Sequence, residues 1–349
     1  MRKVRIGVIG VGSFASAIQL KDLQKIDNAE VVALCDIVKE KAEEQAKIYG
    51  IDSVYSDYHE LLARDDIEAV VLPLPDQIHR QVAVDALHAG KHVLCEKPMA
   101  LNYDDCAAMV KAEKESGKCL MIGQIGRYTP SFLKAKEILD SGLIGDLFFI
   151  ESEYAHDYSK IGGQGGWRVT PEREPIIGGG CHAVDLIRSL AGNPEEVFAY
   201  ANNMSLKDWP IHDCSVAIMK FPSGVIGKVM TSTGCKRLYT MRSVIYGTKG
   251  TLVFDNKSAY ISLYQEQFLP GDTDRFLDIA QQNIALQIPV EVNNHNFAGE
   301  ARDFCNAIEQ GKPIVSDSTN GASTASVCFA IVESFKTGNK VKVRYDFID

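Results

Sequence analysis

Small residues near the amino terminus have the spacing of a dinucleotide-binding turn. Gly10, Gly12 and Ala15 come directly after a short apolar run and begin a helical pattern. The first glycine allows a tight turn, the second lets a pyrophosphate approach the backbone, and the alanine lets the helix lie close to the strand. Because the start of a helix presents free N–H groups to phosphates, Ser13 and Phe14 belong to the predicted cofactor-binding residues.

An acid stands where such a site would meet the adenosine ribose. Asp36 follows the apolar run 31–35, the next predicted strand, at about the twenty-residue spacing that this motif requires. Its carboxylate can accept hydrogen bonds from the ribose hydroxyls, and it would repel the 2′-phosphate of NADP. The nearest basic residue is Lys39, and no arginine follows directly. These residues therefore favour NAD over NADP as the cofactor.

A histidine and an aspartate further along the chain could transfer a proton. His182 and Asp185 follow three consecutive glycines, 178–180, and precede an apolar helical pattern. Residues three apart lie on the same face of a helix, and an imidazole beside a carboxylate is a plausible acid/base pair near neutral pH. The same pattern is also typical of a structural histidine at a helix start with a surface aspartate nearby.

Composition narrows the class of protein. The 349 residues are more than one hydrophobic core usually serves, which predicts two domains. A formal charge of −9 argues against nucleic-acid binding. There is no apolar run long enough for a membrane span and no signal peptide pattern, so we expect a cytoplasmic protein. The nine cysteines contain no C-x-x-C pair and are expected to be buried thiols rather than metal ligands.

The periodicity of the sequence changes near residue 125. Before it, fully apolar strand patterns alternate with helical patterns, which predicts a doubly wound parallel sheet of the Rossmann type over 1–124. After it, longer strand patterns joined by turns predict a large, open, mostly antiparallel sheet with a few helices. We therefore expect an NAD-binding domain at 1–124 and a substrate-binding and oligomerisation α/β domain at 125–349.

Four further segments identify a family. The chain resembles the glucose-fructose oxidoreductase / inositol dehydrogenase / rhizopine catabolism (Gfo/Idh/MocA) oxidoreductases, whose members carry a Glu-Lys-Pro motif in this setting. The segments that carry the resemblance are 72–79, 89–98 with Glu96-Lys97-Pro98, 246–251 and 304–313. The resemblance implies a Rossmann domain followed by an open-sheet α/β domain, and oxidation or reduction of a sugar or polyol with NAD(P). It also implies a homodimer or homotetramer formed through the sheet of the second domain.

The resemblance assigns roles to residues of this chain. Lys97 matches the catalytic lysine of the family, whose ammonium can stabilise the alkoxide that develops on the reacting hydroxyl. His182 and Asp185 match a His-x-x-Asp element in which the histidine is the usual acid/base and the aspartate contacts sugar hydroxyls. Many relatives have an aspartate four residues before that histidine, where this chain has Gly178. The usual lysine–aspartate–histidine arrangement is therefore incomplete in this sequence.

Further residues join the predicted cofactor-binding and substrate-binding sites. The resemblance implies that the cofactor also contacts Pro73, Leu74, Pro75, His79, Glu96 and Lys97. It places His79 on the nicotinamide side. Aromatic and charged side chains that could line a sugar site are added as substrate-binding candidates, namely Tyr154, Asp157, Trp167 and Arg168.

These observations predict an NAD-dependent dehydrogenase that transfers hydride between the nicotinamide and a hydroxyl-bearing carbon of a sugar, sugar derivative or cyclic polyol. Two alternatives stay open. One is a glycoside hydrolase or epimerase that oxidises its substrate transiently with bound NAD. The other is a dinucleotide-sensing regulator, against which an acid/base pair such as His182 and Asp185 argues.

Overall fold

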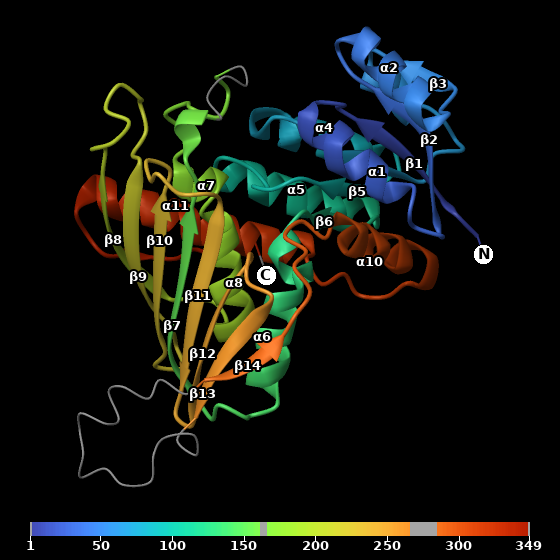
Figure 1. Cartoon of the computed structure of the whole chain (residues 1–349). Coiled ribbons are helices and arrows are strands. Elements are labelled where there is room, and N and C mark those ends of the chain that lie inside the picture. Colours follow the sequence, from blue (N-terminus) through green and yellow to red (C-terminus); the bar gives the residue numbers. More distant parts are fainter. Residues whose placement is uncertain (1, 161–165, 266–284, 348–349) are drawn as a thin grey trace, which may run out of the picture. The chain divides into compact units, whose positions relative to one another are not determined.

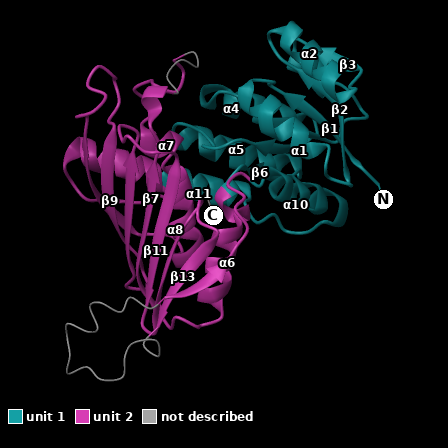
Figure 2. Cartoon of the chain, viewed as in Figure 1, with its two compact units in different colours: residues 1–125, 296–326, 345–349 teal, residues 126–295, 327–344 magenta. Residues whose placement is uncertain are grey.

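The chain forms two compact units, which Figure 2 distinguishes by colour. The computed structural model describes residues 2–160, 166–265 and 285–347. The first unit comprises residues 1–125, 296–326 and 345–349, and the second comprises 126–295 and 327–344. Within the described residues, no helix is both long and apolar enough to cross a membrane.

A six-stranded parallel sheet forms the centre of the first unit (Figure 1). In spatial order its strands are β3 (Ser53–Tyr55), β2 (Ala29–Cys35), β1 (Val4–Ile9), β4 (Ala69–Leu72), β5 (His92–Cys95) and β6 (Leu120–Ile122). Strands β4 and β6 are buried along their whole length, as expected for a parallel sheet covered on both faces. The predicted Rossmann architecture is confirmed.

Helices connect these strands in sequence order. They are η1 (Ala15–Gln19), α1 (Leu20–Leu23), α2 (Lys39–Tyr49), α3 (Tyr58–Leu62), η2 (Asp76–Ile78), α4 (His79–His88) and α5 (Tyr103–Ser116). The helical turns begin at Ser13, and η1 is a π-helical stretch within them. Because all six strands are parallel, the residues that follow them meet at one edge of the sheet.

A segment distant in sequence completes the first unit. Helix α10 (Phe297–Gln310) packs against β1, β5, η1 and α1. Asn28 donates hydrogen bonds from its amide to Asn306 Oδ1 (3.0 Å) and Glu309 Oε2 (3.1 Å) on this helix. The sequence predicted that all residues from 125 onward belong to the second domain. The structure instead places α10 in the first unit. The helical periodicity of this segment predicts that one face is buried, but it does not show which sheet covers that face.

Among its described residues, the second unit contains a nine-stranded sheet in which only β7 and β10 pair in parallel. Its spatial order is β14 (Leu286–Pro289), β13 (Tyr260–Gln265), β12 (Gly250–Asp255), β11 (Thr240–Gly247), β7 (Leu147–Ala155), β10 (Ile226–Ser232), β9 (Cys214–Lys220), β8 (Glu196–Asn202) and β15 (Val341–Lys342). The predicted open, mostly antiparallel sheet is confirmed.

Helices cover one face of this sheet. Helix α8 (Cys181–Ala191) packs on β7 and β10, and α6 (Pro130–Asp140) packs on β12 and β13. Ser334, on the part of α11 (Ser318–Thr337) that belongs to this unit, accepts a hydrogen bond from Ala199 N at 2.9 Å. The remaining short helices are η3 (Ile125–Tyr128), η4 (Tyr158–Lys160) and α7 (Pro175–Gly178). Side chains of β9 alternate between buried and exposed, so the other face is open to solvent.

Candidate active site

The turn after β1 has the backbone geometry that the glycine spacing predicts. Gly10 has φ +98°, in the left-handed region that glycine adopts readily. A Cβ at this position would lie 2.8 Å from Leu74 Cδ2 and 3.2 Å from the Pro73 carbonyl oxygen. A Cβ on Gly12, by contrast, would meet no atom within 4 Å. The segment after β4 therefore packs against the first glycine, while the backbone at the second is open to approach.

Asp36 is held at the end of β2 by two backbone donors. Val11 N donates to its Oδ2 and Val38 N donates to its Oδ1, each at 2.9 Å. The side chain is half-buried, and each carboxylate oxygen keeps a second lone pair for another donor. The acid is thereby fixed beside the glycine turn that it follows in sequence.

These residues fit a bound dinucleotide. Gly12 leaves the space that a pyrophosphate needs, and the Asp36 carboxylate is oriented by the backbone of the same turn. A side chain at Gly10 would clash with the neighbouring segment, so the tight turn requires glycine there. NAD bound here would supply a nicotinamide ring that accepts or returns hydride.

His79 joins the segments that follow β4 and β5. Its Nδ1 lies 2.9 Å from the Pro98 carbonyl oxygen, and its Nε2 lies 3.0 Å from the Leu74 carbonyl oxygen. The side chain is completely buried. In this structure His79 therefore braces Pro73–Pro75 against the Glu-Lys-Pro segment, and its imidazole is enclosed by protein.

Glu96 is bonded to the backbone of the lysine that follows it. Lys97 N donates to Glu96 Oε2 at 3.2 Å, and the Nε2 of the buried Gln19 donates to Glu96 Oε1 at 2.7 Å. Lys97 itself is half-buried and is the second residue after the carboxyl end of β5. It therefore lies on the same edge of the sheet as the turn that contains Gly10.

In the second unit, His182 lies within a group of aromatic side chains. It is in the first turn of α8, and its ring stacks on that of Tyr154, with 6.2 Å between centroids and 23° between planes. The Tyr154 hydroxyl lies 3.2 Å from His156 Nδ1 and 3.4 Å from the Tyr158 hydroxyl. The ring of Tyr239 packs on the edge of Tyr154 at 5.5 Å. We call these five residues the aromatic cluster.

Burial keeps Tyr154 and Tyr239 of this cluster protonated. Desolvation raises the pKa of Tyr154 well above its ordinary value, and the neighbouring Tyr158 and Tyr239 raise it further. Burial likewise raises the pKa of Tyr239. At neutral pH both phenols therefore act as hydrogen-bonding groups rather than as bases.

The guanidinium of Arg173 occupies the space that a side chain at position 178 would need. A Cβ on Gly178 would lie 2.2 Å from Arg173 Nη1 and 2.3 Å from its Cζ. Arg173 is only 1% exposed, and its Nη2 donates to the Gly178 carbonyl oxygen at 3.4 Å. No side chain fits at position 178 while Arg173 is in place. The sequence analysis did not select Arg173, because nothing local distinguishes it from a surface arginine.

Trp167 and Arg168 belong to the surroundings of the same arginine. The Arg168 guanidinium lies 4.3 Å from the centroid of the Trp167 ring, and that of Arg173 lies 5.1 Å from it. Arg173 Nη1 also donates to the Arg168 carbonyl oxygen at 3.4 Å. The structure thus brings these two predicted residues together with the arginine that the sequence analysis missed.

Asp185 is engaged in a buried ion pair. Its two carboxylate oxygens accept hydrogen bonds from Arg127 Nε and Nη2, both at 2.8 Å, and it is 2% exposed. Arg188 Nη1 lies 3.9 Å from Oδ1. The sequence predicted a carboxylate on the same helix face as His182, but Arg127, its main partner, lies far from it in sequence.

Asp157 has a local role in the structure. It accepts hydrogen bonds from Ser159 N at 3.1 Å and Ser159 Oγ at 2.5 Å, and Lys236 Nζ lies 3.7 Å away. The hydroxyl hydrogen bond from Ser159 is the main reason why the pKa of Asp157 is below its usual range. This carboxylate caps the start of η4.

Comparison with known proteins decides the family. An oxidoreductase family with an NAD-binding Rossmann fold matches residues 4–124, and the GFO/IDH/MocA C-terminal domain matches residues 132–253. Together the two models cover more than half of the chain. The chain belongs to the GFO/IDH/MocA oxidoreductase family. The resemblance found in the sequence is confirmed, and the first unit is an NAD-binding Rossmann fold.

Relatives match over nearly the whole chain. Inositol 2-dehydrogenase of Salmonella typhimurium is 28% identical and covers 96% of this chain and 95% of its own length. Myo-inositol 2-dehydrogenase of Thermotoga maritima is 26% identical, with 97% and 98% coverage. Among solved structures, levoglucosan dehydrogenase in complex with NADH and L-sorbose superposes with a TM-score of 0.85 at 22% identity, covering 99% of this chain and all of its own.

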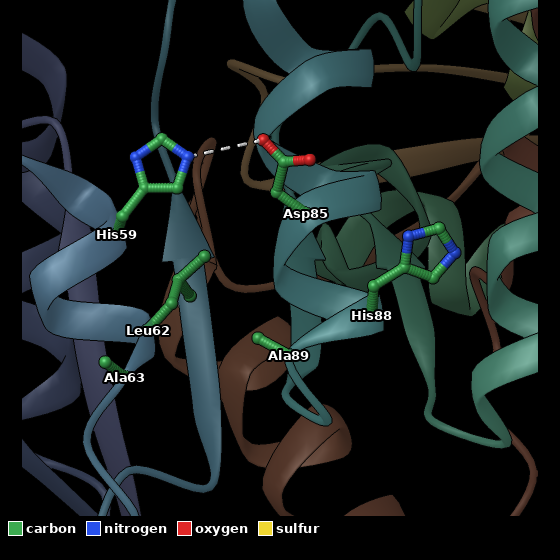
Figure 3. A pocket seen from close by; sticks show the side chains of 6 residues that line it. All are labelled: His59, Leu62, Ala63, Asp85, His88 and Ala89. Atoms are coloured by element: carbon green, nitrogen blue, oxygen red, sulfur yellow. Dashed lines mark ion pairs between the residues drawn. The ribbon is translucent and has the colours of Figure 1, made fainter.

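A hollow on the surface of the first unit lies outside the predicted active site (Figure 3). It measures about 380 Å³, and His59 Nε2 lies 3.9 Å from Asp85 Oδ2 across it. The last turn of α4 lines it. In a parallel sheet, the helix after a strand ends at the opposite edge from the one where Gly10 lies. No group of three or more metal-ligating side chains occurs here or elsewhere among the described residues.

Proposed function

We propose that this oxidoreductase is an NAD-dependent dehydrogenase that acts on a hydroxyl-bearing carbon of a sugar, sugar derivative or cyclic polyol. The observation that carries the proposal is the position of Lys97, two residues after the end of β5, on the sheet edge where Gly10 and Asp36 follow β1 and β2. The inositol and levoglucosan dehydrogenases among its relatives and structural neighbours support the substrate class.

Lys97 is the residue we assign to charge stabilisation. As a hydroxyl is oxidised, negative charge builds up on its oxygen, and a fixed ammonium stabilises that charge most strongly in the transition state. Glu96 helps to hold Lys97 in position, because its carboxylate accepts a hydrogen bond from the Lys97 backbone N–H. The fixed carboxylate of Asp36 favours NAD over NADP, since a 2′-phosphate would bring a second negative charge next to it.

His182 is the residue we assign to proton transfer. Loss of hydride from a carbinol carbon requires removal of the hydroxyl proton, and imidazole titrates near neutral pH. Stacking on Tyr154 fixes the plane of the ring. Asp185 acts on substrate indirectly in this proposal, because both of its oxygens bind Arg127. Trp167 and Arg168 offer an aromatic face and a donor of the kind that binds sugars.

We further propose that the open face of the second sheet forms subunit contacts in a homodimer or homotetramer. Its apolar side chains include Tyr200, which is 72% exposed, together with Val216 and Ile218 on the neighbouring strand β9. Tyr200 pairs directly with Val216 across the ladder. A contiguous exposed apolar surface of this kind is typical of protein interfaces.

We also place the protein in a reducing compartment, the cytoplasm. All nine cysteines are free thiols, and six of them are buried. Burial, with a smaller contribution from Asp36, raises the pKa of the Cys35 thiol to about 12, so that it stays protonated.

The proposal is tested by following NADH formation at neutral pH with myo-inositol, levoglucosan and a panel of hexoses, using the parent protein and His182→Ala. We expect NADH to form with at least one of these compounds and the rate to fall by about 10²-fold or more in the variant. NAD-dependent cleavage or epimerisation of a sugar without net NADH would favour a transient-oxidation enzyme instead. Binding of NAD with no turnover of any compound would favour a regulator.

A further inference from the structure

Glu300 is a buried acid whose environment calls for an explanation. It lies on the first turn of α10 and is 0% exposed. Neither of its carboxyl oxygens has a hydrogen-bonding partner among the described residues. An ionised carboxylate without partners in the protein interior is strongly unfavourable, because it has lost the hydrogen bonds of water without replacement. Glu300 must therefore be neutral, or its surroundings must compensate the charge.

The charged groups that act on Glu300 are both acids. One is Glu96, directly after β5, and the other is Asp303, further along α10. Other ionisable residues on the elements packed against α10 are Arg5 on β1, Lys21 and Asp22 on α1, and His92 and Cys95 on β5. Burial, followed by Glu96 and Asp303, raises the pKa of Glu300 well above its ordinary value. The surroundings therefore oppose ionisation.

Glu96 is in the opposite situation. Its side chain is half-buried, and its two oxygens accept hydrogen bonds from Gln19 Nε2 and Lys97 N. Donors directed at both oxygens stabilise the ionised form of a carboxyl group. Of the two neighbouring acids, Glu96 is therefore the one that carries the charge, and Glu300 is the one that keeps its proton.

A count of donors and acceptors leads to the same assignment. Besides the two oxygens of Glu300, Gln19 Oε1 is also buried without a hydrogen-bond donor among the described residues. With Glu300 ionised, all three of these oxygens can only accept and lack a donor. A protonated carboxyl group turns one of its oxygens into an O–H group, which no longer needs a donor. The number of buried oxygens without a donor therefore falls from three to two when Glu300 is neutral.

We propose that Glu300 is a positioning residue that stays a neutral carboxylic acid beside Glu96, so that Glu96 remains ionised and holds the backbone of Lys97. The functional part of this inference rests on the role proposed above for Lys97. Ionisation of Glu300 would place two negative charges next to each other and displace Glu96, and with it the lysine. Glu300 acts through Glu96 and need not touch substrate or cofactor.

The first test observes the proton directly in the protein without NAD or substrate. The infrared difference spectrum between the parent and Glu300→Gln at pH 7 should contain the C=O band of a protonated carboxylic acid. The exposed helical residue Glu44 provides the control, and Glu44→Gln should instead remove a carboxylate band. A carboxylate band in the Glu300→Gln difference spectrum would overturn the proposal. If Glu300→Gln does not fold, Glu300→Asp should shift the acid band without abolishing it.

The second test is the pH dependence of unfolding in urea. The folded protein keeps a proton on Glu300 that the unfolded chain releases above a pH of about 4.3. The stability of the parent relative to Glu300→Gln should therefore fall as pH rises, by up to tenfold per pH unit in the unfolding equilibrium constant. Glu44→Gln should follow the parent. Parallel profiles for the parent and Glu300→Gln between pH 5 and 9 would rule out the neutral acid.

The third test separates positioning from a purely structural role. The turnover rate of the parent at saturating NAD should fall at high pH as Glu300 ionises, whereas the turnover rate of Glu300→Gln should not fall over the same range. Identical pH profiles of turnover would show that Glu300 does not act through Glu96 and Lys97. The first two tests need neither cofactor nor substrate, so the absence of dehydrogenase activity would leave them unaffected.

Discussion

The two candidate regions of this molecule are built in different ways. The turn after β1 takes Gly10, Gly12 and Ala15 from six consecutive positions, and Asp36 follows at the end of the next strand. The region around His182 is assembled from side chains of β7, η4 and α8, from His156 after β7, and from Tyr239 before β11. The comparison shows that a binding turn made of backbone can be recognised in a sequence, whereas a cluster made of side chains depends on the fold.

Two glycines illustrate the difference. Gly12 has open space where a Cβ would be, and Gly178 has the Arg173 guanidinium in that space. Gly12 leaves space that a ligand could enter, whereas Gly178 leaves space for a neighbouring side chain of the same protein. In the sequence both are simply glycines close to residues that resemble those of the family.

The largest effect should come from Lys97, which tests whether the first region contributes to chemistry as well as to binding. Lys97→Met should lower the rate of turnover by about 10²–10⁴-fold, because one fixed charge next to the developing alkoxide is lost. NAD affinity, measured by fluorescence titration, should stay unchanged. The exposed Lys111→Met serves as control and should turn over at the parent rate. Turnover of Lys97→Met within about tenfold of the parent would mean that the lysine is misassigned.

The next effect concerns the tertiary contacts of the second region. Asp185→Asn should lower the free energy of unfolding by about 3–5 kcal/mol, since it leaves the buried Arg127 guanidinium without its counter-charge. Urea denaturation measures this loss. The matched control is Asp140→Asn, whose ion pair with Lys136 is exposed and whose removal should cost about 0–1 kcal/mol. Equal losses in the two variants would contradict the structural role of Asp185.

Substituting alanine for Gly178 or Gly12 should have smaller effects, which differ between the two positions. Gly178→Ala should destabilise the fold by about 1–3 kcal/mol, because the new methyl group overlaps the Arg173 guanidinium. Gly12→Ala should leave stability within about 0.5 kcal/mol of the parent but weaken NAD binding by about tenfold or more. Thermal denaturation and NAD titration of both variants measure the two quantities. A stable Gly178→Ala, or a Gly12→Ala that binds NAD normally, would remove the distinction.

The smallest effect concerns cofactor choice within the first region. Asp36→Ser removes a charge from the place where a 2′-phosphate would lie, so the preference for NAD over NADP should narrow by about tenfold. Comparing kcat/KM for the two cofactors in the parent and the variant measures this change. Equal use of NAD and NADP by the unmodified protein would refute the assignment of Asp36.

Local sequence determined much of this protein. Apolar runs, turn glycines and one acid at the right spacing were enough to predict the parallel sheet, the dinucleotide turn and the family, because these features depend on residues close to one another in the chain. The antiparallel character of the second sheet was also predictable, since alternating burial is a property of each strand by itself.

Tertiary structure alone decided which distant residues meet. It placed α10 on the first sheet and so brought Glu300 close enough to Glu96 for the two acids to interact electrostatically. It also put Arg173 in the space beside Gly178, and it paired Asp185 with Arg127. A buried arginine and an exposed one look alike in a sequence, because burial depends on which surface the chain folds against. For the same reason the sequence could indicate that His182 and Asp185 share a helix face, but not what that face contacts.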